Sequence, residues 1–519
     1  MRELPERFNF AAHLLQRNLG NHDRLAYIDD TRRQTYGELD ASVRAFAAGL
    51  IAHGVRPEER ILLVMHDTID MPVALLGALY AGVVPVPVNT LLPASDYAYM
   101  LQHCSARLAI VTAPLLPCMQ EALQLSGLQT PLFVTGMPTP ALQGVQSFEA
   151  LLATDGQDRP PEDTHADQIA FWLYSSGSTG RPKGTVHTHA NLYWTATLYG
   201  TPVLGVGRDD IVFSAAKLFF AYGLGNGLTF PLTAGATTIL MAERPTPAAI
   251  FERLVRYRPT LFCGVPTLYV GMLASPDLPT RAQVALRLCA SAGEALPREV
   301  GERFKAHFGA DILDGLGSTE MLHIFLSNRS DDLRYGCSGK PVPGYVLELR
   351  DESGHPTPVG EIGDLYIRGP SAALLYWTAR EKSRATFQGE WVKSGDKYQV
   401  DAAGFYTYAG RSDDMLKVSG QYVSPIEVEG VLMSHSSVLE CAVIGHVDAE
   451  GLTRTVAYVV ARAGQDTGDA LAMDLKAWVK GKLAPHKYPR EILFVDDLPK
   501  TATGKIQRFK LRALSDRMS

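Results

Sequence analysis

The sequence predicts an α/β protein, in which a large N-terminal domain of two parallel-rich, helix-covered sheets plus a small β-barrel precedes a small, mobile α+β C-terminal domain. The chain has 519 residues, more than a single hydrophobic core usually serves, so two or more domains are expected. Segments of strand length alternate with segments of helical period over most of the chain, which favours parallel sheets covered by helices. The pattern changes near Gly339 and again at Ser424, and these changes mark the later parts.

The N-terminal region carries the alternating pattern. Thr35 and Glu38 have capping-box spacing, apolar residues then recur at helical intervals, and Gly54 can end the helix. Strands are expected at 61–65, 83–88, 108–112, 131–135, 169–174, 211–215, 237–241, 260–264, 286–291 and 311–313. Further helices are expected up to residue 81 and at 97–103, 115–125, 189–199, 247–257 and 297–308.

The region after Gly339 has a different pattern. Apolar and polar residues alternate at 345–350 and 364–368 between Gly/Pro turns, which predicts a small antiparallel barrel or sheet. After Ser424 we expect, in order, a helix at 425–433, strands at 439–445 and 455–461, a helix at 470–482 and a strand at 491–495. A polar link at 410–417 separates the two regions, so the predicted domains are 1–412 and 413–519.

Charge and cysteine content exclude several classes of protein. There are 49 Lys and Arg against 55 Asp and Glu, a net charge of −6, which argues against a general nucleic-acid or membrane-surface binder. The six cysteines form no C-x-x-C pair, which indicates a reduced compartment without a zinc site. The apolar run at 71–88 contains Pro85 and Pro87 and fits a buried helix followed by a strand. The first seven residues lack the charged-then-apolar order that is typical of a signal peptide. We therefore expect a cytoplasmic protein.

One glycine-rich stretch follows the apolar run at 169–174 and reads Tyr174-Ser-Ser-Gly-Ser-Thr-Gly-Arg-Pro-Lys-Gly184. Its glycines permit close backbone approach to a ligand, its hydroxyls and N–H groups can donate, and Arg181 and Lys183 add positive charge. Between a strand and a helix, such a stretch predicts a nucleotide phosphate site. The spacing matches neither a Walker loop nor a G-x-S-x-G hydrolase turn, and a plain linker rarely carries Arg-Pro-Lys after a strand.

This stretch resembles the signature loop of the adenylate-forming superfamily, which includes acyl-CoA synthetases, luciferases and peptide-synthetase adenylation domains. Matching motifs run from about Phe8 to the C-terminus, and within the superfamily the chain resembles the benzoate–CoA ligases. The resemblance implies an enzyme that uses ATP, Mg²⁺ and coenzyme A. It would convert benzoate, or a simply substituted benzoate, into an acyl-adenylate and then into benzoyl-CoA.

The resemblance also implies a set of nucleotide ligands. Thr319 would bind the α-phosphate and Glu320 the Mg²⁺, whereas an acidic turn after a strand is by itself more often solvated or capping. Asp396 and Arg411 would hold the ribose, and Leu316 stands where many members have an aromatic residue beside adenine. The full implied ATP/AMP set is Ser175, Ser176, Gly177, Ser178, Thr179, Gly180, Lys183, Ala292, Gly293, Glu294, Asp314, Gly315, Gly317, Ser318, Thr319, Asp396 and Arg411.

An acyl-acid pocket is implied around the aromatic stretch that begins at Lys217. Read alone, that stretch is more typical of core, and a lone His323 among apolar residues is more typical of a buried core histidine. The residues that match a benzoate pocket are Phe220, Ala221, Tyr222, Gly317, His323, Ile324 and Lys417. No long apolar tunnel is indicated, so a flat ring fits better than a fatty chain.

The remaining implied residues lie near the C-terminus. Lys505, in Pro499-Lys-Thr-Ala-Thr-Gly-Lys505, matches the superfamily's adenylation catalyst, and Lys500 is expected to be structural. Asp413 matches the hinge about which the mobile C-terminal domain would rotate between half-reactions. Ser419 and Gly420 would then face the site and admit the thiol of coenzyme A.

Two alternative functions and two further expectations remain. An aryl-acid adenylation protein that loads a carrier-protein pantetheine would have the same site, and free coenzyme A as acceptor distinguishes the two. A non-catalytic nucleotide-binding homologue is disfavoured because Thr319, Glu320, Asp396 and Lys505 occur together. A homodimer and acylation of Lys505 are further expectations.

Overall fold

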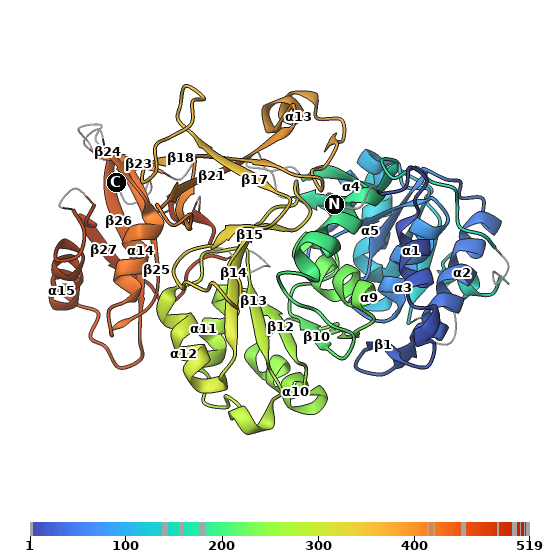
Figure 1. The fold of residues 1–519 in the computed structure, drawn as a ribbon, viewed down its shortest axis with the longest axis horizontal. Coiled ribbons are helices and arrows are strands. Elements are labelled where there is room, and N and C mark those ends of the chain that lie inside the picture. Colours follow the sequence, from blue (N-terminus) through green and yellow to red (C-terminus); the bar gives the residue numbers. More distant parts are fainter. Residues whose placement is uncertain are drawn as a thin grey trace.

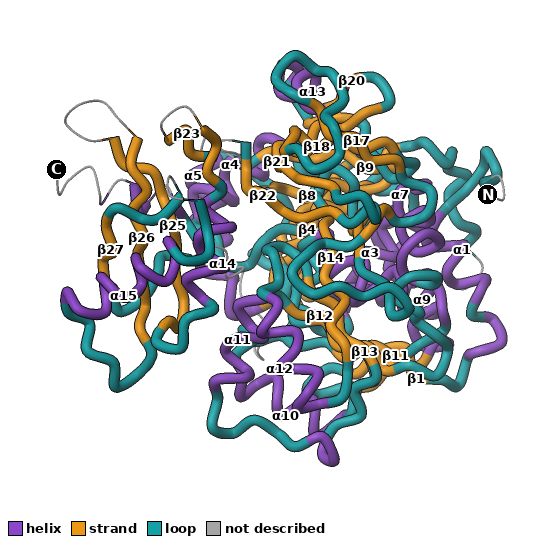
Figure 2. Tube along the Cα trace, turned by 60° about the vertical axis from the view of Figure 1, so that its left-hand side comes forward, coloured by secondary structure: helices purple, strands orange, loops and turns teal. Residues whose placement is uncertain are grey.

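The computed structural model describes residues 4–136, 144–154, 159–175, 182–412, 415–418, 421–447, 453–484, 487–500, 506–508, 510–512 and 514. Figure 1 shows the elements from α1 to α5 at one end of the molecule and those from β23 to α15 at the other, with the remaining sheets between them. The turned view in Figure 2 again places β25, β26, β27 and α15 together at one end. The predicted division into a large N-terminal and a smaller C-terminal part is confirmed.

A five-stranded parallel sheet forms the N-terminal layer, in the order β4-β3-β5-β6-β7. Its strands are β3 (Arg60–Val64), β4 (Val84–Pro87), β5 (Leu108–Thr112), β6 (Leu132–Thr135) and β7 (Gln146–Ser147). The helices of this region are α1 (Phe10–Arg17), α2 (Tyr36–Ala52), α3 (Asp70–Tyr80), α4 (Ala94–Cys104), α5 (Leu116–Ser126) and α6 (Glu149–Leu152), with short 3₁₀ turns η1 (Leu19–Asn21) and η2 (Ala113–Leu115). β4 accommodates Pro85 and Pro87 because it is an edge strand of this sheet.

The capping box predicted at Thr35 is present. The Thr35 hydroxyl accepts from the Glu38 N–H at 3.2 Å, and a Glu38 carboxylate oxygen accepts from the Thr35 N–H at 2.8 Å. The helix α2 ends as predicted, since Gly54 has a φ of 79° and the Val55 N–H returns to the Leu50 carbonyl.

A nine-stranded mixed sheet forms the centre, in the order β16-β15-β14-β13-β12-β10-β11-β1-β2. The run from β14 to β1 is parallel, and β2, β15 and β16 are added antiparallel at the two edges. The strands are β1 (Leu25–Ile28), β2 (Arg33–Thr35), β10 (Ile211–Ser214), β11 (Thr237–Ile239), β12 (Leu261–Gly264), β13 (Leu288–Ser291), β14 (Asp311–Gly317), β15 (Ile324–Ser327) and β16 (Lys340–Pro341). This part also contains helices α7 (His189–Thr195), α8 (Ala221–Leu224), α9 (Phe230–Ala234), α10 (Pro247–Tyr257), α11 (Pro266–Ala274) and α12 (Arg298–Phe308), π-helical segments η3 (Ala196–Gly200) and η4 (Gly225–Thr229), and the 3₁₀ turn η5 (Arg281–Gln283).

The surroundings of the glycine-rich stretch differ from the prediction. The stretch follows β8 (Ile169–Ser175) as expected, but it leads into β9 (Lys183–Thr188), which pairs antiparallel with β8. It therefore joins two strands rather than a strand and a helix, so that prediction was wrong. β9 also pairs with β19 (Leu375–Tyr376), and α7 begins only after Thr188, whose side chain caps it through Asn191.

The expected change of pattern appears as a five-stranded antiparallel sheet of β17 (Val346–Arg350), β18 (Ile362–Arg368), β20 (Phe387–Gln388), β21 (Trp391–Val400) and β22 (Tyr406–Arg411), with α13 (Arg380–Thr386) beside it. In the part of the chain that the structure describes, the pairing leaves this sheet open rather than closed into a barrel.

The C-terminal elements are β23 (Leu416–Val418), β24 (Gln421–Val423), α14 (Pro425–Met433), β25 (Val438–Val447), β26 (Thr453–Ala461), α15 (Asp469–Lys480) and β27 (Glu491–Phe494). The three strands from β25 to β27 form one sheet, and their buried side chains form clusters of their own with those of α14 and α15. Within the described ranges, no helix is long and apolar enough to cross a membrane.

Candidate active site

Glu320 lies just after β14, where three segments distant in the sequence meet. The Tyr376 hydroxyl donates to its carboxylate Oε1 at 2.7 Å, and the Ala373 N–H donates to its carbonyl at 2.7 Å. The ammonium of Lys183, at the start of β9, lies 4.1 Å from the centre of the Tyr376 ring. Burial lowers the pKa of Lys183, and the Glu320 carboxylate opposes that shift. The structure thus brings two predicted site residues together around Tyr376.

Thr319 is fixed through its backbone by His187. The imidazole Nε2 of His187 lies 2.8 Å from the Thr319 carbonyl oxygen. Burial lowers the pKa of His187 to about 4, so near neutral pH the ring is uncharged and its Nε2–H donates to that carbonyl. His187 and Tyr376 are not among the residues predicted from the sequence. These two residues approach the site because β9 pairs with β19, and the sequence of neither short segment predicts that pairing.

Asp396 and Arg411 face each other on the neighbouring strands β21 and β22. Their closest side-chain atoms, Arg411 Nη1 and Asp396 Oδ1, are 3.2 Å apart, and the same nitrogen donates to the Ser394 carbonyl at 3.3 Å. Gly395 has a φ of 77°, and a Cβ there would lie 3.0 Å from Arg411 Nη2, so glycine leaves room for the guanidinium. The predicted ribose pair is therefore in direct contact.

The carboxyl end of β13 lies beside the middle of β14, with Ser291 opposite Asp314. Gly293, just past β13, has a φ of 98°, and Glu294 accepts from the Thr267 hydroxyl at 2.9 Å. Asp314 is buried, and burial raises the pKa of its carboxyl. Its Oδ2 accepts from the Leu296 N–H at 3.4 Å, so this carboxyl lies beneath the strand ends rather than on the surface.

The backbone past Asp314 is closely packed. A Cβ at Gly315 would lie 2.9 Å from the Leu326 carbonyl oxygen, and one at Gly317 would lie 2.8 Å from the His323 carbonyl carbon. The Ser318 hydroxyl accepts from the Met321 N–H at 3.2 Å, which closes the turn that presents Thr319 and Glu320. Ala292 is buried at the end of β13.

His323 is the centre of the predicted acyl pocket. Its ring centroid lies 5.3 Å from Tyr199, 5.6 Å from Tyr222 and 4.5 Å from Phe230. Burial lowers the pKa of His323 to about 3, so the ring is uncharged and its Nε2–H donates to the Tyr222 carbonyl at 3.2 Å. A Cβ at Gly225 would overlap the His323 ring, which explains the glycine-rich end of this segment.

The other pocket residues divide between two hydrophobic clusters. Tyr222 packs with the buried Ile324, whereas Phe220 and Ala221 pack against the N-terminal cluster. The ring of Phe220 lies edge-on to Phe219, with centroids 4.6 Å apart. The segment that holds these residues therefore lies at the junction of the two clusters.

Several predicted residues lie outside the described ranges: Ser176, Gly177, Ser178, Thr179, Gly180, Asp413, Ser419, Gly420 and Lys505. Ser175 is described as the last residue of β8, opposite Lys183. The backbone of Lys417 lies in β23, in register with Tyr422.

The donor set can be compared with the needs of a divalent cation. Over the residues that the structure describes, no group of three or more His, Cys, Asp and Glu side chains could hold a metal ion. Mg²⁺ commonly uses one or two carboxylates and takes its remaining ligands from phosphate oxygens and water. Glu320, half-buried and close to Lys183, fits such a shared site.

Comparison with known proteins shows the family to which the chain is similar. Residues 15–377 match the family model described as AMP-binding enzyme, and residues 427–505 match the AMP-binding enzyme C-terminal domain. The benzoate–CoA ligase of Thauera aromatica is 56% identical over 515 residues, covering 98% of this chain and 97% of that protein. The 4-hydroxybenzoate–CoA/benzoate–CoA ligase of Rhodopseudomonas palustris is 46% identical, covering 98% and 94%.

Solved structures agree with this placement. A crystal structure of a benzoate CoA ligase from Burkholderia xenovorans LB400 is 62% identical, with a TM-score of 0.92 over 97% of this chain and 100% of that one. An anthranilate CoA ligase in complex with anthranoyl-AMP is 40% identical, with a TM-score of 0.94 over 99% of this chain and 98% of that one. The chain belongs to the AMP-binding enzyme family.

Proposed function

We propose that the chain is an ATP-dependent ligase that activates benzoate as benzoyl-adenylate and transfers the benzoyl group to coenzyme A. The observation that carries the proposal is the 62% identity, over nearly the whole of both chains, to a protein described as a benzoate CoA ligase. The compact surroundings of His323, with Tyr222 and Ile324, support a flat ring as the acyl group.

The chemistry follows from the weakness of carboxylate as an acyl donor. In the first step a carboxylate oxygen attacks the α-phosphorus of ATP, the bond to the bridging oxygen breaks, and pyrophosphate leaves. In the second step a thiolate attacks the carbonyl carbon, and AMP leaves with the electron pair of the broken C–O bond. The first step brings two anions together, so positive charge placed at the α-phosphate lowers its barrier.

Each group receives a role in this proposal. Thr319 binds the α-phosphate, Lys505 bridges carboxylate and phosphate during adenylation, and Asp396 with Arg411 holds the ribose. Glu320 would hold Mg²⁺, which supplies charge neutralisation at the phosphates. The contact of Tyr376 with Glu320 and that of His187 with Thr319 support these positions, because each contact limits the freedom of the turn after β14.

The two half-reactions need different partners beside one carbonyl. We place the domain boundary between residues 412 and 413 and propose that the C-terminal domain rotates about Asp413 between the steps. Lys417, Ser419 and Gly420 would then reach the site and admit the thiol. Support comes from the separate hydrophobic clusters of the C-terminal elements.

Three finer points belong to the same proposal. The chain would act in the cytoplasm, in keeping with six free cysteines. It would form a homodimer, which sedimentation of the purified protein would reveal. Acylation of Lys505 would remove the ammonium charge and suppress adenylation.

The test is a panel of aryl, cyclohexyl and short aliphatic acids, assayed for AMP formation that depends on coenzyme A. Benzoate should give the highest kcat/KM, and 4-hydroxybenzoate belongs in the panel because the R. palustris relative's name includes it. Release of AMP only in the presence of a carrier protein would support the adenylation-protein alternative instead. Silence with every acid would contradict the proposed activity.

A further inference from the structure

Asp67 is a buried carboxylate that none of the proposed roles uses. It follows β3 and is 4% exposed. Both carboxylate oxygens accept from the Leu218 N–H, at 3.2 and 3.1 Å. Leu218 lies beyond β10, so this contact links the five-stranded sheet to a loop of the nine-stranded sheet across 151 positions of sequence.

The peptide between Lys217 and Leu218 is held on both edges. Its N–H donates to Asp67, and its carbonyl oxygen accepts from the Phe220 N–H at 3.0 Å. Gly223 packs directly against it, because a Cβ there would overlap the Lys217 carbonyl oxygen. The orientation of this peptide therefore determines the direction in which the chain leaves toward Phe220.

The side chain of Lys217 ties the same peptide to the segment after β11. Its ammonium donates to the Met241 carbonyl and, at 2.6 Å, to the Glu243 carbonyl, both beyond β11. Burial raises the pKa of Asp67 to about 6, while the charge of Lys217 and the Leu218 N–H act in the opposite direction. Truncating Asp67 would leave the Leu218 N–H without its acceptor in a buried position, which is costly, so the loop should shift rather than stay in place.

The held peptide leads directly into the proposed acyl pocket. The Leu224 N–H donates to the Phe220 carbonyl at 2.8 Å, which starts α8, and the Tyr222 carbonyl receives the His323 imidazole at 3.2 Å. A shift of the Lys217–Leu218 peptide would therefore move Phe220, Ala221 and Tyr222 together. The nucleotide residues Asp396 and Arg411 are on other strands, β21 and β22, and would not follow.

The geometry points to Asp67 as a positioning residue that holds the segment 217–224 and thereby sets affinity for the aromatic acid without touching it. This assignment rests on the proposed function, because that proposal places Phe220, Ala221 and Tyr222 at the acid. It separates acid binding from ATP binding: loss of the Asp67 contact disturbs the acid pocket and leaves the nucleotide site intact.

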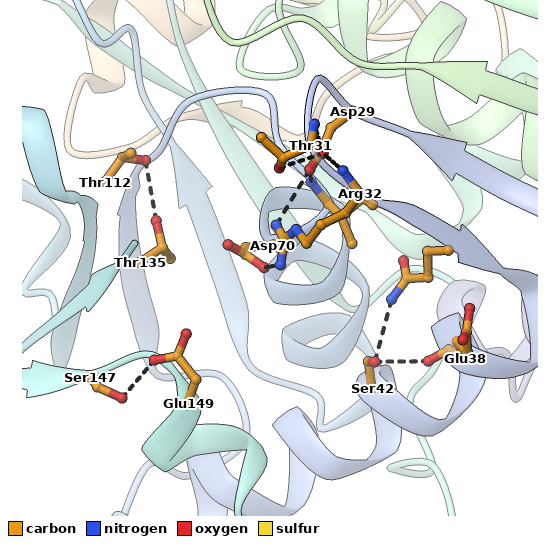
Figure 3. Close-up of polar contacts among 12 residues, drawn as sticks. Asp29, Thr31, Arg32, Glu38, Ser42, Asp70, Thr112, Thr135, Ser147 and Glu149 are labelled. Carbon is orange, nitrogen blue, oxygen red and sulfur yellow. Dashed lines mark hydrogen bonds and ion pairs between the residues drawn. The ribbon is translucent and has the colours of Figure 1, made fainter. Parts of the chain in front are cut away.

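A matched control exists at the end of β1. Asp29 is 5% exposed and accepts from the Thr31, Arg32 and Ile69 N–H groups at 2.9, 2.6 and 3.1 Å. Figure 3 shows Asp29 together with Thr31, Arg32 and Asp70. These contacts hold the turn after β1 and, through Ile69, the start of α3 two residues beyond Asp67. A variant at Asp29 therefore removes a buried carboxylate from the same neighbourhood but keeps the contact of Asp67 with Leu218.

The experiment compares full-length Asp67→Ala, Asp67→Asn and Asp29→Ala with the wild type, with the KM for benzoate and the KM for ATP measured separately. Loss of a hydrogen bond to a charged group predicts that Asp67→Ala raises the benzoate KM roughly tenfold or more, with the ATP KM changed by less than about twofold. Asp67→Asn keeps an acceptor for the Leu218 N–H and should recover most of the loss. Asp29→Ala should leave the benzoate KM close to that of the wild type.

Equal rises in both KM values for Asp67→Ala, or the same benzoate effect in Asp29→Ala, would overturn the assignment. If Asp67→Ala does not fold, Asp67→Ser takes its place, since the shorter hydroxyl cannot span the same gap and the same split is expected. If the wild type prefers another acid, the proposed substrate is wrong, and the same variants measured with that acid still decide the role of Asp67.

Discussion

At the scale of single residues, the site depends on pairs that the sequence separates widely. Glu320 and Tyr376 are joined by a 2.7 Å hydrogen bond across 56 positions, and His187 reaches the Thr319 carbonyl across 132. Each catalytic candidate after β14 thus has a partner on another segment. Substitutions of the partner should weaken the function of the candidate without removing it.

The first prediction concerns the charge of Glu320. Glu320→Gln keeps the shape of the side chain but removes the charge, so the concentration of Mg²⁺ needed for half-maximal rate should rise tenfold or more, on the order expected for loss of one charged ligand. Tyr376→Phe removes only the hydrogen bond to Glu320 and should give a smaller shift. Titration of initial rates with Mg²⁺ measures both, and an unchanged Mg²⁺ dependence in Glu320→Gln would exclude Glu320 as the ligand.

At the scale of elements, the strand and helix pattern was readable from the sequence where periodicity was local. The helices α10 and α14 have the predicted bounds, and the capping box at Thr35 marked the start of α2. The pairing of β9 was not readable, because its six residues become a strand only between β8 and β19. Tyr376 could not be predicted for the same reason, because this residue of β19 lies opposite Thr185 of β9 only through the long-range pairing.

The second prediction concerns the two lysines of the C-terminal motif, Lys500 and Lys505. Lys500 forms ion pairs with Glu440 at 2.7 Å and Asp497 at 3.2 Å, and the Gln507 N–H donates to the Pro499 carbonyl at 2.7 Å. These contacts support the structural role predicted for Lys500. Lys505, in contrast, is proposed to bridge carboxylate and phosphate only during adenylation. Lys505→Ala should depress benzoyl-adenylate formation by several orders of magnitude, whereas thioester formation from added benzoyl-adenylate should be nearly unchanged.

Lys500→Ala is the matched control, because it removes an ammonium from the same motif. It should lower thermal stability of the C-terminal domain and reduce both half-reactions by similar, smaller factors. Single-turnover rates of the two half-reactions give the comparison. A parallel fall of both rates in Lys505→Ala would mean that this lysine supports the fold or a domain contact, and the catalytic assignment would be wrong.

At the scale of the whole molecule, alternation of strands and helices was enough to predict layered sheets and a separate C-terminal part. It could not predict which loops meet between the two large sheets. Asp67 follows a strand of the five-stranded sheet and Leu218 follows a strand of the nine-stranded sheet, and no local pattern links them. The proposed acyl pocket lies beside this junction. Its residues could be proposed from the resemblance, whereas the side chains that hold them could not.

The buried histidines give a third prediction about stability. Burial lowers the pKa of His13 and His187 to about 4 and that of His189 and His323 to about 3, against an ordinary value of 6.5. The unfolded chain therefore binds more protons than the folded chain as the pH falls below 6.5, and stability is lost progressively down to about 3. Asp67, whose pKa is raised to about 6, contributes one proton in the opposite direction.

The melting temperature should accordingly fall as the pH is lowered from 7.5 to 5. His189→Gln retains an acceptor for the Phe10 N–H, which lies 3.2 Å from Nδ1 in the wild type, and removes one titrating group. The free energy of unfolding of this variant should change less steeply with pH, by the share of one histidine, about 1.4 kcal/mol per pH unit at most, and its melting temperature should therefore depend less on pH. Identical pH slopes for variant and wild type would show that His189 is not the group responsible.

The central claim is that a benzoate oxygen attacks the α-phosphorus of ATP in this site. The direct measurement uses benzoate labelled with ¹⁸O in both carboxylate positions, together with ATP, Mg²⁺ and coenzyme A, and mass spectrometry of the products. Attack by the carboxylate places one ¹⁸O in AMP for each benzoyl-CoA formed and none in pyrophosphate, because the labelled oxygen that bonds to phosphorus leaves with AMP. Label in pyrophosphate or inorganic phosphate, or AMP without label while benzoyl-CoA accumulates, would contradict it.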